Sequence, residues 1–363
     1  MKKGLIILLV GLIIGATLGV FGTRAVLNNK ENTAIVKNTE KKTPLEKHGK
    51  LHVDGMNVYD QNNNIFQIRG ISTHGLGMGI RYSEEQYSNM YAYYANYESF
   101  KSLRDFFGIN AVRLAMYPST TAGNHPLTHD MIKNAVKDLN ELGLYAIIDW
   151  HTMREGDPNN LIDDSKAFFT EMASEFKDYS NVLYEICNEP NDTNNNGNPV
   201  TWEDNIKPYA LEIIKIIRSY NKDAIITIGT PGFCHDIKEV ADNPITGYSN
   251  LLYSFHFYAG NAGEPSREKL RYAIEKKLPV YISECGMVNG NGDGAVGYES
   301  AQIWMKILQD NNLGFTVWQL SNKSEGSSLI KSTCYKLSNW KYEDLSDHCK
   351  LLYDYLHSIP AQE

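Results

Sequence analysis

Short apolar runs rich in β-branched residues recur along most of this 363-residue chain, and their rhythm limits what it can fold into. The eight runs lie at residues 68–73, 109–116, 145–151, 181–189, 224–230, 251–258, 279–284 and 314–321. Between them lie stretches with apolar residues three and four positions apart, as in 129–143 and 205–220. That spacing is typical of an amphipathic helix. We therefore expect strands and helices in alternation.

The predicted strands are apolar on both faces, which is the pattern of parallel strands covered by helices. Eight strand and helix units predict an α/β protein with a closed (β/α)8 TIM barrel. A doubly wound sheet is the alternative, although such a sheet more often carries a G-x-G-x-x-G phosphate turn after its first strand, and no stretch with that spacing follows residues 68–73. The Asp54-Gly55 pair and an Asn-rich turn at 62–64 predict a short N-terminal hairpin before the barrel.

The composition narrows the possible partners. The formal net charge of −8 argues against nucleic acid, because phosphate backbones are bound by clustered Lys and Arg. Five cysteines, an odd number without a CxxC motif, argue against a zinc site or a dense disulfide framework. Cys334 and Cys349 either pair in an oxidising compartment or remain free thiols. We expect a monomer with neither metal nor cofactor.

The first residues predict export. Two lysines precede Gly4 to Gly22, a run of 19 residues without a charge. A membrane span takes about 20 residues, whereas a cleaved signal has an apolar region of about 7 to 15. We expect residues 1–27 to be an uncleaved membrane signal-anchor, with a signal peptide cleaved near 23–25 as the alternative. Residues 28–50 are polar and predict a tether, which leaves 51–363 as an extracellular catalytic domain, either tethered or secreted.

Polar residues gather where the predicted strands end. In a (β/α)8 barrel these C-terminal ends form one rim, and the chemistry lies there. Taken singly, each such residue is more often a helix cap, a core residue or a salt-bridge partner. Their coincidence on one rim indicates an active site. The residues are His74, Arg113, Tyr117, Asp149, His151, Asn188, Glu189, His256, Tyr258, Glu284 and Trp318.

Two carboxylates on this rim suit hydrolysis of a glycosidic bond, in which one acid protonates the leaving oxygen and the other attacks or activates water. Neither an HExxH motif nor a tight His/Asp triplet indicates a metal site. Glu284, near Arg113 and Tyr258, is expected to stay ionised as the nucleophile. Glu189, beside His256 and an apolar wall, is expected to hold a proton as the acid/base.

Two neighbours are expected to recognise the sugar. Asn188 is placed to donate its amide to the sugar 2-hydroxyl, and Trp318 offers a flat face to a pyranose ring. If the mechanism is retaining, the closest carboxyl oxygens of Glu189 and Glu284 should lie about 5 Å apart, whereas about 9 Å would indicate inversion.

Seven motifs carry a resemblance to a known family. They are RGISTHGL (69–76), VRLAMY (112–117), IIDWH (147–151), YEICNEPN (184–191), SFHFYAG (254–260), SECG (283–286) and WQLSNKSEGSSL (318–329). In this order, from about Leu51 to the C-terminus, the chain resembles glycoside hydrolase family 5 and, within it, bacterial endo-β-1,4-glucanases. The resemblance implies a retaining, endo-acting cellulase with Glu189 as acid/base and Glu284 as nucleophile.

The resemblance also implies the substrate-binding residues. Around the cleaved sugar it places Arg113, His151, Asn188, His256, Tyr258 and Trp318. For the sugars before it, the resemblance implies His74, Tyr117, Lys323 and Glu325. A solvated ion pair in a loop is the alternative reading of Lys323 and Glu325.

The chain departs from its apparent relatives at two positions. Met78 stands where related glucanases often have a tryptophan that stacks on glucose, and Tyr82 is a candidate replacement. Cys285 stands where an aromatic residue often follows the nucleophile. These departures leave mixed-linkage glucan, xyloglucan or mannan open as substrate. A non-catalytic carbohydrate-binding barrel is the alternative from another functional class.

Overall fold

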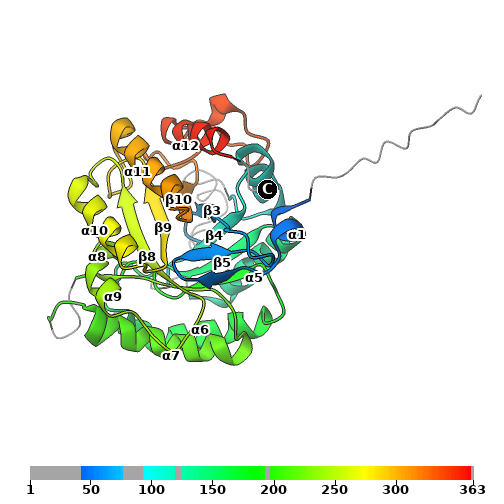
Figure 1. Cartoon of the computed structure of the whole chain (residues 1–363). Helices are drawn as coiled ribbons and strands as arrows, with labels where there is room; N and C mark the ends of the chain where they lie inside the picture. The colour runs from blue at the N-terminus through cyan, green and yellow to red at the C-terminus, as the bar shows by residue number, and fades with distance from the viewer. Residues whose placement is uncertain (1–41, 77–92, 119–123, 193–196, 361–363) are drawn as a thin grey trace, which may run out of the picture. The chain divides into compact units, whose positions relative to one another are not determined.

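Eight parallel strands close into a barrel in the computed structural model (Figure 1). The structure describes residues 42–76, 93–118, 124–192 and 197–360. Consecutive strands pair side by side, and the last pairs with the first, which closes the barrel. This closure confirms the predicted (β/α)8 fold and excludes a doubly wound sheet. The strands are β3 (Arg69–Thr73), β4 (Ala111–Met116), β5 (Tyr145–Trp150), β6 (Val182–Glu185), β7 (Ile226–Ile228), β8 (Leu251–Tyr258), β9 (Val280–Gly286) and β10 (Phe315–Leu320).

Helices surround the barrel, with α6 and α7 along one side of it in Figure 1 and α10, α11 and α12 around another. The long helices are α5 (Pro126–Glu141), α6 (Ile162–Glu175), α7 (Lys207–Tyr220), α10 (Glu264–Glu275), α11 (Tyr298–Asp310) and α12 (Asp347–Ser358). Shorter helical segments are α4 (Tyr97–Ser102), η1 (Leu103–Phe107), η2 (Pro158–Leu161), η3 (Trp202–Ile206), α8 (Pro231–Cys234), α9 (Lys238–Asp242) and η4 (Tyr342–Asp344). The periodicity at 129–143 and 205–220 therefore predicted α5 and α7 correctly.

The predicted hairpin is present, and the folded domain begins before it. Strands β1 (His52–Asp54) and β2 (Asn57–Tyr59) pair antiparallel. Ahead of them, α1 (Pro44–His48) already packs on the domain, because the N–H of Leu45 donates to the carbonyl of Gly143 and the buried His48 lies 3.0 Å from Asp60. The boundary expected at Leu51 therefore moves to near Lys42. A polar helix of this length has no apolar period to reveal it.

The barrel interior changes from apolar to polar along the strands. Near their N-terminal ends one apolar cluster fills it together with Leu51, Val58 and Phe66 from the hairpin region. The members of this cluster in the strands are Ala111, Tyr145, Ile147, Leu183, Leu252 and Tyr281, and Ile225 directly precedes β7. Because side chains in a strand alternate between two faces, residues two positions further along also face inward. Those residues include Arg113, Asp149, Glu185 and Ser254, and all four are buried.

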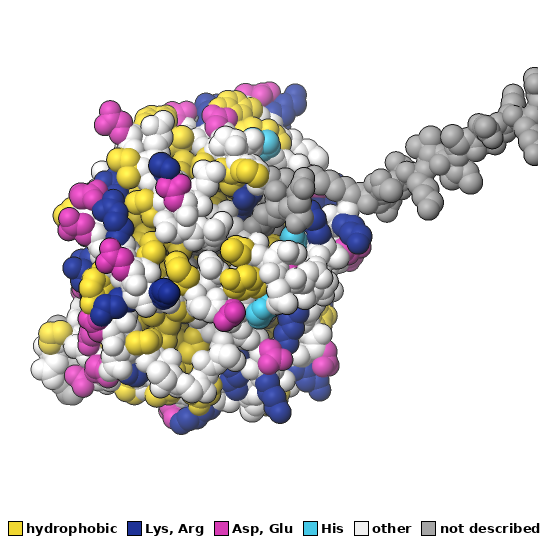
Figure 2. Space-filling model, viewed as in Figure 1, with side chains coloured by type: hydrophobic (Ala, Val, Ile, Leu, Met, Phe, Trp, Pro, Cys, Tyr) yellow, Lys and Arg dark blue, Asp and Glu magenta, His cyan; other side chains and the backbone are white. Residues whose placement is uncertain are grey.

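The outer surface carries mixed charge. On the face shown in Figure 2, Lys and Arg side chains are interspersed with Asp and Glu rather than gathered in a basic patch. Among the residues that the structure describes, no helix combines the length and apolar character needed to cross a membrane. The predicted signal-anchor, residues 1–27, lies outside the described residues. All five cysteines are free thiols.

Candidate active site

One buried arginine on β4 connects the strands that carry the site. Nε and Nη2 of Arg113 donate to the two oxygens of Glu185 at 2.7 and 3.0 Å. Nη2 also lies 2.6 Å from Oδ1 of Asn188 and 3.0 Å from Oδ2 of Asp149. Nη1 donates to Oε2 of Glu284 at 3.1 Å. A single guanidinium thus aligns polar groups from β5, β6, the segment after β6, and β9.

Glu284 lies within β9 and is held by two donors. Besides the Arg113 contact at Oε2, its Oε1 accepts a hydrogen bond from the hydroxyl of Tyr258 at 2.7 Å. Burial raises the pKa of Tyr258 well above its usual value, so this hydroxyl keeps its hydrogen. Glu284 thus accepts one charge-assisted hydrogen bond from a cation and another from a hydroxyl, and these two donors fix the orientation of its carboxyl group. This environment suits a nucleophile.

Glu189 follows β6 and has a neutral partner instead. Its Oε1 lies 2.8 Å from Nδ1 of His256. Burial lowers the pKa of His256 to about 4, so the ring is uncharged near neutral pH. Burial also raises the pKa of Glu189 to about 7, against the opposing effect of Arg113. Glu189 can therefore exist in both protonation states near pH 7, which is what an acid/base requires.

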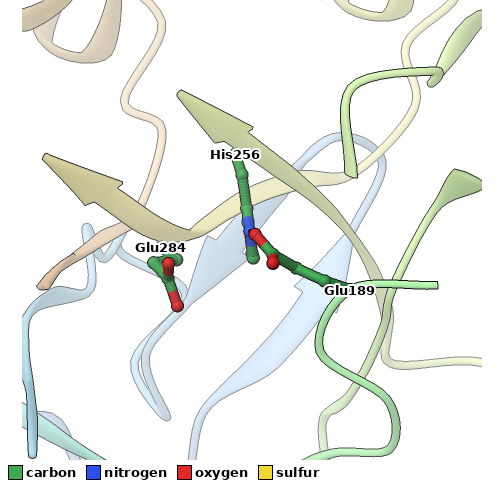
Figure 3. Close-up of side chains that lie close together, drawn as sticks. All are labelled: Glu189, His256 and Glu284. Atoms are coloured by element: carbon green, nitrogen blue, oxygen red, sulfur yellow. The ribbon is translucent and has the colours of Figure 1, made fainter. Parts of the chain in front are cut away.

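The two glutamates face each other across a short gap. Figure 3 shows the carboxylate of Glu189 turned toward the ring of His256, with Glu284 opposite. An oxygen of Glu189, a ring nitrogen of His256 and an oxygen of Glu284 all lie within 4.8 Å of one another. Retaining glycosidases separate their carboxyl groups by about 5 to 5.5 Å, and inverting ones by about 6.5 to 9.5 Å. The spacing agrees with the retaining separation expected from the sequence.

The same three side chains also form a His/Glu/Glu set that sequence spacing does not reveal. As ligands for a cation they fit poorly. Both oxygens of Glu284 already accept hydrogen bonds, one of them from the positively charged Arg113. A metal ion there would have to lie beside a guanidinium and displace these donors.

The amide of Asn188 is oriented by its neighbours. Its Oδ1 accepts from Arg113, so its Nδ2 points away and donates to the carbonyl of Thr152 at 3.1 Å. Nδ2 also lies 3.4 Å from Nε2 of His151, at the outer limit of a hydrogen bond. His151 is fixed in turn by Asp149, whose Oδ2 lies 2.6 Å from its Nδ1. The second N–H of Asn188 therefore makes only the long contact with His151.

Aromatic rings line the rim beside the carboxylates. The ring of Trp318 stacks on His151, with centroids 5.1 Å apart at 14°. His74 lies 5.8 Å from Trp318 and 6.3 Å from Tyr117, and Tyr117 lies 4.3 Å from His151. Trp318 also packs in one apolar cluster with Tyr258. The structure thus brings His74, Tyr117 and Trp318 together beside His151 and Tyr258.

Lys323 and Glu325 form an ion pair in the loop after β10. Glu325 is tied to this strand, because its Oε1 accepts from Nε2 of Gln319 at 3.0 Å, and also from Ser327 at 2.9 Å. The pair is therefore anchored near Trp318 and differs from a freely solvated loop pair. Met78 and Tyr82, at the altered sugar platform, lie outside the described residues.

Sequence reasoning missed two buried polar residues of the site, Glu185 and Ser283, and the contacts of a third, Asp149. Glu185, within the apolar run of β6, accepts two hydrogen bonds from one edge of the Arg113 guanidinium. Asp149 was noted at a strand end, but its contacts with Arg113 and His151 were not anticipated. Ser283 contacts His256 from the neighbouring strand. A charged residue inside an apolar strand was the available signal for Glu185, because such a charge is rarely buried without a partner.

The chain after β6 packs directly on the end of β7. A Cβ atom added to Gly229 would lie 2.4 Å from the carbonyl oxygen of Cys187 and 2.8 Å from that of Asn188. The thiol of Cys234 donates to this Asn188 carbonyl at 2.9 Å. Glycine at 229 is therefore required for the backbone to deliver Asn188 and Glu189 to their places.

The fold and the site together define a class of protein. A closed (β/α)8 barrel carries two carboxylates at the C-terminal ends of its strands, at the spacing of a retaining pair and in unlike surroundings. This is the apparatus of a retaining glycoside hydrolase.

The chain belongs to glycosyl hydrolase family 5, the cellulase family, whose model matches residues 59–324. It is 40% identical over 323 residues to endoglucanase A of Butyrivibrio fibrisolvens, covering 87% of this chain and 70% of the relative. It is 37% identical over 300 residues to an endoglucanase of Clostridium saccharobutylicum, covering 82% of this chain and 63% of the relative. The chain thus spans only part of the length of both proteins.

Solved structures share the fold over nearly their whole length. Cellulase Cel5C_n superposes with a TM-score of 0.79 at 31% identity, covering 88% of this chain and 95% of that one. The catalytic domain of Thermobifida fusca endoglucanase Cel5A, in complex with cellotetraose, gives a TM-score of 0.77 at 30% identity. That comparison covers 87% of this chain and 100% of the other.

We predict that Gly229→Ala lowers kcat/KM for glycoside hydrolysis by roughly 10- to 100-fold, because a small displacement of catalytic groups has an effect of that order. The added methyl group must push Cys187 and Asn188 away, and Glu189 moves with them. Gly263→Ala is the matched control, since its Cβ would meet only Pro265, at 3.9 Å. Equal activity of the two variants would show that Gly229 does not position the acid.

Proposed function

We propose that this chain is a retaining endo-β-1,4-glucanase acting on cellulose-like β-glucans. The observation that carries the proposal is the unequal pair of glutamates within 4.8 Å. The names of the curated relatives, which are endoglucanases, support the substrate class, as does the similar structure in complex with cellotetraose. Endo action is the mode that these relatives' names imply.

In the first step, the carboxylate of Glu284 attacks the anomeric carbon of the bound sugar. The glycosidic C–O bond breaks, and its electron pair goes to the leaving oxygen, which takes the proton of Glu189. The product is a glycosyl ester on Glu284. Tyr258 and Arg113 orient Glu284 for this attack, and a neutral His256 leaves Glu189 able to hold the proton beforehand.

In the second step, Glu189 is ionised and accepts a proton from water. The oxygen of that water attacks the anomeric carbon, and the bond to Glu284 breaks with its electron pair returning to the carboxylate. The product keeps the β configuration because the anomeric carbon has been inverted twice.

The remaining predicted residues are assigned to substrate binding. Asn188 donates to the 2-hydroxyl of the cleaved sugar, and Trp318 stacks against its ring. His151, with the pKa lowered to about 3 by burial, stays neutral beside that ring. The sugars before the cleaved one are assigned to His74 and Tyr117, and to the anchored pair of Lys323 and Glu325.

Three alternative functions can be distinguished from this proposal by experiment. A related β-1,4-polysaccharide hydrolase would prefer mannan, xyloglucan or mixed-linkage glucan in a substrate panel. A non-catalytic carbohydrate-binding barrel would bind these polymers and release no reducing sugar. A metal-dependent hydrolase would lose activity in a chelator, whereas the proposed mechanism would not.

We predict that the enzyme releases reducing sugar from carboxymethyl cellulose and that Glu284→Gln lowers this activity by several orders of magnitude, because the amide is not a nucleophile. Glu299→Gln is the matched control, since it makes the same change at an exposed position on α11. Thermal unfolding of both variants checks the fold. Retained activity of Glu284→Gln would remove Glu284 as the nucleophile.

We predict that kcat/KM falls as the pH rises above about 7. Burial raises the pKa of Glu189 to about 7, and the first step needs the protonated acid, which is the dominant form only below that pH. The decline should approach tenfold per pH unit. In Glu189→Gln, the residual activity should lack this alkaline limb, because an amide does not titrate. An unchanged limb would assign it to another group.

Residues 1–27 are proposed to direct export, as a membrane signal-anchor or as a signal peptide, and the residues before Lys42 to act as a tether. The uncharged run after two lysines supports this proposal. The whole chain, expressed in a Gram-positive host, should give activity in the membrane fraction if the segment is retained, and in the medium if it is cleaved. Cytoplasmic activity alone would contradict export.

We also propose a monomer, to be checked by light scattering.

A further inference from the structure

Two serines extend the contact between His256 and Glu189 into the barrel. Nε2 of His256 lies 2.9 Å from Oγ of Ser283, and this Oγ lies 2.8 Å from Oγ of Ser254. With the 2.8 Å contact between Nδ1 and Oε1 of Glu189, the four side chains form one unbroken chain. Both serines and His256 are 0% exposed, so water does not compete for these contacts.

An irregularity in β9 makes this chain of contacts possible. In the pairing of β8 with β9, Ser254 lies opposite Tyr281, whereas His256 lies opposite Glu284. Two residues of β8 are therefore matched by three of β9, which is the count of a β-bulge. Strict alternation would send Ser283 and Glu284 to opposite faces. Instead Ser283 reaches His256 while the next residue, Glu284, reaches Arg113.

The number of hydrogens available decides which side chain donates to which along this series of hydrogen bonds. A neutral imidazole carries hydrogen on one nitrogen only. In one arrangement Ser254 donates to Ser283, Ser283 donates to Nε2 of His256, and Nδ1–H donates to Glu189. Every hydrogen then has an acceptor, and the chain ends on a carboxyl oxygen.

The reverse arrangement leaves the hydroxyl hydrogen of Ser254 without an acceptor. Glu189 would donate to Nδ1, Nε2–H to Ser283, and Ser283 to Ser254, whose own hydroxyl hydrogen would need a further acceptor. Among the described residues, Oγ of Ser283 is the one hydrogen-bond partner of the Ser254 hydroxyl. A buried hydroxyl hydrogen without an acceptor is destabilising. The first arrangement is therefore favoured.

We propose that Ser254 and Ser283 hold His256 in the tautomer with hydrogen on Nδ1, and thereby keep the acidic proton of Glu189 on Oε2. Because Nδ1–H already points at Oε1, the proton of Glu189 occupies the other oxygen, which is the one left for the leaving group. The two serines are positioning residues that act through His256. The inference rests on the acid/base role proposed for Glu189.

The Nδ1–H tautomer of His256 suits both steps of the reaction and does not change between them. When Oε2–H passes to the leaving oxygen, the negative charge left on Glu189 is stabilised by the Nδ1–H bond already in place. When water attacks, Oε2 accepts a proton from that water, and Nδ1–H still points at Oε1. His256 neither gains nor loses a proton in either step.

We expect Ser283→Ala to lower kcat/KM for cellotetraose by about 3- to 10-fold, the effect of one hydrogen bond of ordinary net strength. With 2,4-dinitrophenyl β-cellobioside, kcat/KM should be unchanged, because this leaving group departs without a proton. Ser283→Thr keeps the hydroxyl and should restore activity on cellotetraose. Ser99→Ala, which removes a buried hydroxyl on α4, is the control and should alter neither substrate.

The ¹⁵N spectrum of the His256 imidazole reads the tautomer directly in the unmodified protein, even if Ser283→Ala were not to fold. Hydrogen on Nδ1 supports the proposal, and hydrogen on Nε2 overturns it. An equal loss on both substrates, or no loss on cellotetraose, also overturns it while the enzyme remains active. If the unmodified protein does not hydrolyse cellotetraose at all, the proposed function fails, and the spectrum still tests the hydrogen-bond chain.

Discussion

The site depends on the burial of one guanidinium. Arg113 is completely removed from water, and such a charge is tolerated only where opposite charges and hydrogen bonds replace its hydration. Glu185, Asp149 and Glu284 supply these from three other strands. Arginine suits this place better than lysine, because its planar fork donates along fixed directions to several acceptors. Glu185, Asp149, Glu284 and Asn188 therefore share one central partner.

The same arginine makes the surroundings of the two proposed catalytic glutamates unlike. It contacts Glu284 directly, whereas the hydrogen-bond partner of Glu189 is the neutral ring of His256. Glu284 is thus held by a cation, and Glu189 can keep a proton because burial disfavours its charged form and raises its pKa. Chemically identical side chains acquire different roles from their neighbours, which is the general way a glycosidase separates nucleophile from acid. The Nδ1–H tautomer inferred for His256 would refine this further by selecting one oxygen of Glu189.

Strand periodicity and the polar residues at strand ends were sufficient to predict the barrel and the residues of its rim. This worked because a parallel barrel places all these ends together, so a one-dimensional pattern specifies a three-dimensional site. Glu185 and Ser283 were not predicted, since a pattern of apolar runs does not say which residue in a run points inward. At Ser283 the bulge in β9 also breaks the alternation on which such reasoning depends. The start of the domain was placed too late, because α1 is held by a capping box and an ion pair and carries no apolar stripe.

The central claim is that the spacing of Glu189 and Glu284 commits the enzyme to two displacements at the anomeric carbon. The most direct test is to follow hydrolysis of cellotetraose by proton NMR within the first minutes, before the product mutarotates. The account predicts that the new reducing end appears first as the β anomer. Initial release of the α anomer would mean a single inversion. It would contradict both the role of Glu284 as nucleophile and the mechanism inferred from carboxyl oxygens that lie within 4.8 Å of each other.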